Sequence, residues 1–123
     1  MSGRVLAAVD DIFFKAKLRG AAEHLGVEIE FARDTDGCVE AARQNPPAVV
    51  VADLHAERCD PFAIAGRFKS DAQLSSVPLV GFYSHVQTEL QRRAQLAGFD
   101  QVLPRSAFVQ RLPAILRGGD GQS

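Results

Sequence analysis

The sequence of 123 residues has no tryptophan, only two cysteines and no cluster of basic residues. A net charge of −1 gives no bulk attraction to nucleic acid or to an anionic membrane, and no run of lysine and arginine offers a local basic patch. Cys38 and Cys59 lack the CxxC spacing of a metal or redox site, which favours two reduced thiols. No apolar run is long enough for a membrane span or a signal-peptide core. We therefore expect a cytoplasmic protein that binds neither nucleic acid nor membrane.

What the sequence does contain is a series of short apolar runs. The first, third and fourth lack polar alternation, as do strands of a parallel sheet when helices cover both faces. Each run is short enough to be a single strand, and the fifth is the weakest. The runs cover residues 4–9, 27–32, 48–53, 77–83 and 101–104.

Segments with helical periodicity separate these runs. Gly26 and Gly98 are typical of residues that end a helix, and Asp60, followed by proline, is typical of a helix start. Ser106 is expected to cap a last helix, which Pro113 should kink or split. Because strand and helix alternate five times, the sequence predicts one α/β domain with a doubly wound parallel sheet.

Acidic residues stand at the ends of two predicted strands. Asp10 and Asp11 follow the first strand, and Asp53 ends the third. Ligands of such folds bind where the carboxyl ends of the strands meet, so the three carboxylates share one crevice if these strands are neighbours. A hard divalent ion such as Mg²⁺ would relieve their repulsion, with the backbone carbonyl of His55 as a further ligand. Alternatively, Asp10 or Asp11 caps the helix that follows, and Asp53 is a turn residue.

Other polar residues are expected at the same edge of the sheet. Tyr83 and Ser84 end the fourth strand, and Arg105 follows the fifth. A cation on the far wall of an acidic crevice suits a phosphoryl group, so these three residues are candidates for phosphate binding. The alternative for Arg105 is an ordinary surface ion pair.

Taken in order, four motifs resemble the receiver domain of bacterial two-component response regulators, the CheY-like family. They are VDD after the first strand, VVVAD in the third, VPLVGFYS in the fourth and the segment GFDQVLPRSAF. The resemblance implies a flavodoxin-like (βα)5 domain over residues 1–117 with strand order 2-1-3-4-5, and a disordered tail over residues 118–123. It also implies that Asp53 is the catalytic phosphoacceptor, with Asp10 and Asp11 holding Mg²⁺ beside it, and a histidine kinase or phosphotransfer protein as donor.

Three positions depart from the family pattern. Tyr83 stands where the family has serine or threonine, and Ser84 would face the other side of the sheet unless a bulge intervenes. Arg105 replaces a lysine, and Val102 replaces the aromatic residue that many receivers carry. The acidic half of the site therefore matches the family, while the half that responds to phosphorylation is atypical.

The resemblance implies a stand-alone signalling domain and not an enzyme, with at most autophosphorylation and autodephosphorylation activity. It implies a downstream protein partner on the face formed by the fourth helix, fifth strand and fifth helix, with Arg92, Arg93 and Arg111 as candidate contacts, and it allows a homodimer. One alternative is a pseudo-receiver that acts as a phosphorylation-independent scaffold, which the atypical switch positions favour. Another is a small Mg²⁺-dependent phosphohydrolase, with His55 as a general acid.

Overall fold

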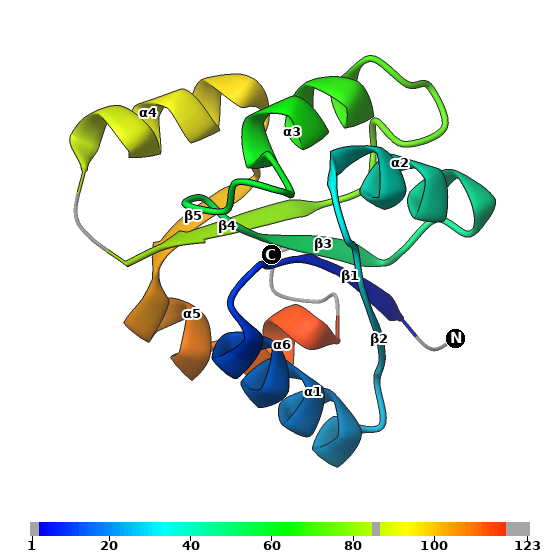
Figure 1. Cartoon of the computed structure of the whole chain (residues 1–123), viewed down its shortest axis with the longest axis vertical. Coiled ribbons are helices and arrows are strands. Elements are labelled where there is room, and N and C mark those ends of the chain that lie inside the picture. The colour runs from blue at the N-terminus through cyan, green and yellow to red at the C-terminus, as the bar shows by residue number, and fades with distance from the viewer. Residues whose placement is uncertain (1–2, 85–86, 118–123) are drawn as a thin grey trace.

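A computed structural model describes residues 3–84 and 87–117, and it contains one sheet of five parallel strands in the order β2-β1-β3-β4-β5 (Figure 1). Helices α2, α3 and α4 cover one face of the sheet, and α1, α5 and α6 cover the other (Figure 1). The predicted fold class and strand order are therefore confirmed. The predicted tail, residues 118–123, lies outside the described residues. The elements are β1 (Arg4–Ala8), α1 (Ile12–Leu25), β2 (Glu28–Phe31), α2 (Thr35–Gln44), β3 (Val49–Asp53), α3 (Pro61–Lys69), β4 (Leu79–Tyr83), α4 (Thr88–Ala97), β5 (Gln101–Pro104), α5 (Arg105–Gln110) and α6 (Leu112–Leu116).

The three central strands are buried because helices cover both of their faces. Every residue of β1 and β4 is buried, and so are the first four residues of β3, whereas exposure alternates along the edge strand β2. β1 pairs directly with β3, and Ala8 lies opposite Ala52. Both strands consequently end at the same level, and the residues that follow them meet at one edge of the sheet.

The helix boundaries agree with most of the sequence signals. Gly26 and Gly98 end α1 and α4 in the left-handed conformation, with φ of 70° and 118°. The carboxylate of Asp60 accepts the first free N–H groups of α3. Pro113 lies at the start of α6, so the predicted split of the last helix is confirmed.

The expectation that Ser106 caps the last helix is wrong. α5 begins at Arg105, directly after Pro104, which is the last residue of β5. Pro104 is extended, with φ of −64° and ψ of 151°, so the chain turns into the helix at once and Ser106 already lies inside it. No side chain of residues 3–84 and 87–117 caps this helix.

The two cysteines, Cys38 and Cys59, are free and buried in the layer beneath α2 and α3. Burial raises the pKa of Cys38 to about 12 and that of Cys59 to about 11, so neither forms a reactive thiolate at neutral pH. Within residues 3–84 and 87–117, no helix combines the length and the apolar character that crossing a membrane requires.

Candidate functional site

Asp53 is a half-buried carboxylate at the end of β3. One of its oxygens, Oδ1, accepts the backbone N–H of His55 at 2.9 Å. Burial raises the pKa of Asp53 above its usual value of 3.8, and the negative charge of Asp10 acts in the same direction. The N–H of His55 and the charge of Arg105 oppose this shift. Asp53 therefore lies close enough to Asp10 and to Arg105 to sense both charges.

Asp10 anchors the loop between β3 and α3. Its Oδ2 accepts the backbone N–H groups of Glu57 at 2.9 Å and of Arg58 at 3.0 Å. These residues are far apart in the sequence, and the two hydrogen bonds fix the loop that follows Asp53 against the end of β1. The carboxylate thus has a structural task in addition to any role toward a ligand.

Asp11 caps α1, which confirms the alternative interpretation of this residue. Its Oδ1 accepts the backbone N–H of Phe13 at 2.9 Å and that of Phe14 at 3.4 Å. The hydrogen bond from Phe13 is the main reason that the pKa of Asp11 is lowered. The other oxygen, Oδ2, lies 3.5 Å from Nη2 of Arg105. Asp11 is therefore committed to the helix end and to this guanidinium.

Arg105, the first residue of α5, contacts Phe14, a member of an aromatic trio made of Phe14, Phe82 and Phe108. Its guanidinium lies over the ring of Phe14, 4.1 Å from the centroid. Phe14 contacts Phe82 with centroids 5.0 Å apart, and Phe82 stacks on Phe108 at 4.5 Å. The cation is thus positioned by stacking as well as by charge, which a lysine would do less well.

The sequence analysis missed the part that Phe14 plays. The available signal was its position three residues after Asp11, which places both residues on the same side of the first helical turn. Phe14 is 5% exposed, so it combines a core role with support of the charged group.

Tyr83 and Ser84 lie in different surroundings. Tyr83 is 7% exposed and belongs to the apolar layer that also contains Ala94 and Phe99. Ser84 is exposed at the end of β4. Val102 also packs against this layer, so an apolar side chain occupies the position of the family's aromatic residue. Contact of Tyr83 or Ser84 with a phosphoryl group stays a prediction.

The carboxylates fit Mg²⁺ only in part. Among residues 3–84 and 87–117, no group of three His, Cys, Asp or Glu side chains is arranged to hold a metal ion. Mg²⁺ often uses only one or two carboxylates and keeps several waters, which Asp10 and Asp53 can satisfy. Asp11 could join them only after releasing Arg105. The carbonyl of His55 stays a predicted ligand.

Comparisons with known proteins find matches in structure and not in sequence. No family model matches the chain, and no curated protein does. The chemotaxis response regulator CheY4 of Vibrio cholerae has a TM-score of 0.80 and 17% identity, covering 94% of this chain and 99% of that one. A putative response regulator from Chloroflexus aurantiacus has a TM-score of 0.82 and 17% identity, with coverage of 94% and 98%.

A third similar structure is the receiver domain of a sensor histidine kinase from Pseudomonas aeruginosa, described with a magnesium ion coordinated in its active site cleft. Its TM-score is 0.81 at 15% identity, and the match covers 97% of this chain and 100% of that one. Identities this low establish a shared fold. The chain therefore has the five-stranded parallel α/β fold of CheY-like response regulator receiver domains.

Proposed function

We propose that this protein is a receiver domain of a two-component phosphorelay and accepts a phosphoryl group on Asp53. The observation that carries the proposal is the setting of Asp53 in a receiver fold. Its half-buried carboxylate has a raised pKa and lies near both Asp10 and Arg105. Clustered acids with a stacked cation at the carboxyl edge of a parallel sheet suit the transfer of an anionic group.

In the proposed reaction, an oxygen of Asp53 attacks the phosphorus of a phosphohistidine on a histidine kinase or phosphotransfer protein. A phosphorus–oxygen bond forms and the phosphorus–nitrogen bond breaks, and its electron pair returns to the imidazole of the donor. The raised pKa makes the ionised carboxylate a better nucleophile. Mg²⁺, when held by Asp10 and Asp53, would neutralise charge on the transferring group.

Arg105 is the residue that we expect to respond to the new phosphate. Phosphorylation adds negative charge and acceptor oxygens beside Asp53, and a guanidinium binds phosphate oxygens strongly in a bidentate manner. Its present ion pair with Asp11 is long, at 3.5 Å, and partly exposed, so exchanging this partner costs little. This response replaces the one that a serine or threonine would make at position 83.

The surroundings of the site favour a protein as the phosphoryl donor. Ile12 and Phe13, directly after Asp11, are 69% and 82% exposed. Adjacent apolar side chains at the rim of a site suit contact with another protein. For the output, we propose the face of α4, β5 and α5. Arg93 contributes less there than the sequence suggested, because its guanidinium packs over Phe62 of α3 at 3.9 Å.

A pseudo-receiver that acts as a scaffold is the second candidate. The hydrogen bonds that Asp11 accepts at the α1 terminus and its ion pair with Arg105 favour it, because both compete with a metal ion for this carboxylate. The burial of Tyr83 favours it as well, since this side chain packs in the apolar layer with Ala94 and Phe99.

Labelling with a small phosphoryl donor in the presence of Mg²⁺ separates the two candidates. We expect the protein to gain the mass of one phosphoryl group, Asp53→Ala to gain none, and Asp36→Ala, at an exposed acid of α2, to behave like the unmodified protein. Labelling that persists in Asp53→Ala, or none in any form, would refute phosphorylation on Asp53. Steady turnover of a small phosphate ester would instead support the phosphohydrolase.

A further inference from the structure

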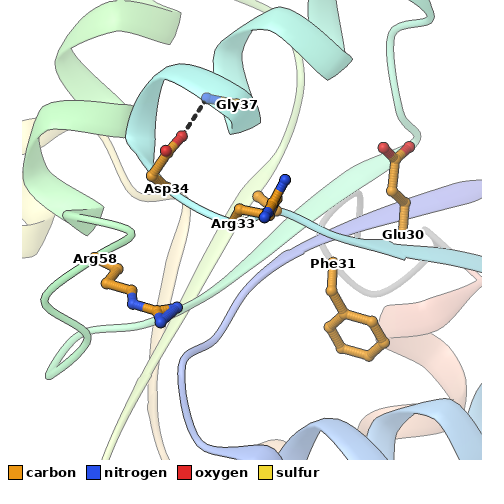
Figure 2. Close-up of a pocket in the computed structure, with 7 residues that line it drawn as sticks. Glu30, Phe31, Arg33, Asp34, Gly37 and Arg58 are labelled. Carbon is orange, nitrogen blue, oxygen red and sulfur yellow. Dashed lines mark hydrogen bonds between the residues drawn. The ribbon is translucent and has the colours of Figure 1, made fainter.

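A pocket of about 680 Å³ lies beside the end of β2, apart from the acidic site (Figure 2). Its walls come from the end of β2, the start of α2 and the loop between β3 and α3. None of the residues assigned above to phosphoryl transfer lines it. The lining residues are Glu30, Phe31, Ala32, Arg33, Asp34, Gly37 and Arg58.

The acids of this pocket are engaged, and its arginines are not. Glu30 forms an ion pair with Arg4, and Asp34 accepts the backbone N–H of Gly37 at 2.7 Å, which caps α2 (Figure 2). In contrast, the guanidinium groups of Arg33 and Arg58 have neither an ion pair nor a hydrogen bond within residues 3–84 and 87–117. Figure 2 shows the two arginines on separate segments of the lining, Arg33 beside Asp34 and Arg58 on its loop. In the described part of the chain, the pocket thus presents two cations without an ion pair.

We propose that this pocket binds a phosphate group, either as free phosphate or as the monoester of a small organic molecule. The volume lies within the range of small-molecule sites, roughly 300–1,000 Å³. One guanidinium can satisfy both oxygens of a carboxylate, whereas the three terminal oxygens of a phosphate monoester can engage two guanidiniums at once. Ala32, which is buried, supplies an apolar contact for the organic part.

Binding of a phosphate group in the pocket should affect the acidic site through Arg58. Its backbone N–H donates to Asp10 while its side chain reaches into the pocket. Thr35 ties the two walls together, because its hydroxyl donates to the carbonyl of Arg58 at 3.5 Å and accepts the N–H of Asp60 at 3.0 Å. The inference goes beyond the proposed function, since binding requires neither Asp53 nor its phosphorylation.

A titration of the 123-residue chain followed by amide NMR tests this inference. The probes are inorganic phosphate, adenosine 5′-monophosphate and, as an uncharged control, adenosine, without divalent ions and at near-physiological salt. We expect saturable shifts at Arg33, Gly37 and Arg58 with the two phosphates and none with adenosine. Tighter binding of the nucleotide would assign the site to a monoester, and equal binding would assign it to free phosphate.

Two substitutions locate the site. Arg33→Gln and Arg58→Gln should each weaken binding about ten-fold, the effect of losing one charge-assisted hydrogen bond. Both side chains are exposed, so these variants should fold normally, and Arg58→Gln keeps the backbone contact with Asp10. Arg43→Gln on α2, at an exposed arginine that pairs with Asp71, serves as the matched control and should bind unchanged. Absence of saturation, unchanged affinity in both variants, or shifts centred on Arg105 would overturn the inference.

Discussion

Replacing Asp10 with alanine should release the loop between β3 and α3. The substitution removes the acceptor for the N–H groups of Glu57 and Arg58, at 2.9 and 3.0 Å. A hydrogen bond to a charged group contributes about 1.5–3 kcal/mol, with the lower end appropriate for exposed groups such as these. Relief of the repulsion between Asp10 and Asp53 offsets part of the loss. We therefore expect the free energy of unfolding to fall by about 1–3 kcal/mol.

Urea denaturation measures the global change, and amide hydrogen exchange locates it. The amides of Glu57 and Arg58 should exchange about ten-fold faster or more in Asp10→Ala, because 1.4 kcal/mol corresponds to a factor of ten. Glu23→Ala, at an exposed position of α1, is the control and should change stability by less than about 0.5 kcal/mol. Unchanged exchange at both loop amides, together with unchanged stability, would refute the view that Asp10 holds this loop.

Three further substitutions probe the sheet and the site. Gly81→Ala should cost about 1–3 kcal/mol in urea denaturation, because a Cβ there lies 2.9 Å from Cδ2 of Leu54. Gly66→Ala, which meets nothing within 4 Å in α3, should stabilise the protein, and an equal effect of both changes would contradict this account of packing. Asp53→Asn should stabilise the protein at neutral pH, since the raised pKa of Asp53 means that folding disfavours its charged form. This gain in the free energy of unfolding should shrink as pH falls through the raised pKa and vanish below the usual value of 3.8. A gain independent of pH would exclude the charge of Asp53 as its cause. Arg105→Ala should cost about 0.5–2 kcal/mol through lost stacking on Phe14 and should raise the pKa of Asp53 further in an NMR titration. A lower pKa of Asp53 would be inconsistent with the proposed proximity.

The sequence was sufficient to predict the architecture because its signals are local and agree with one another. Uninterrupted apolar runs fixed the central strands, and Gly26, Gly98 and Asp60 marked helix boundaries that the structure has. The prediction for Ser106 was wrong because β5 passes directly into α5, so that Ser106 already lies inside the helix. A helix boundary that depends on the path of the backbone cannot be predicted from the identity of one residue.

The sequence predicted that Asp10 and Asp53 lie at one edge of the sheet, but it did not predict which groups their oxygen atoms contact. The adjacent strands β1 and β3 bring Asp10 and Asp53 to one edge, as the resemblance to receiver domains implies. The sequence could not reveal that Asp10 holds a loop starting more than forty residues later, or that Asp11 divides its oxygens between a helix end and Arg105. Those assignments depend on side-chain rotamers and on non-local loop geometry, which periodicity does not encode.

The direct passage from Pro104 into Arg105 has a mechanical consequence. A flexible loop would let a side chain at its centre shift without disturbing the elements on either side. Here β5 ends at Pro104 and α5 begins at Arg105, so no loop separates them. Arg105 is joined on one side to a residue whose ring fixes φ, and on the other to a hydrogen-bonded helical turn. Any displacement of the Arg105 backbone must therefore tilt β5, α5 or both.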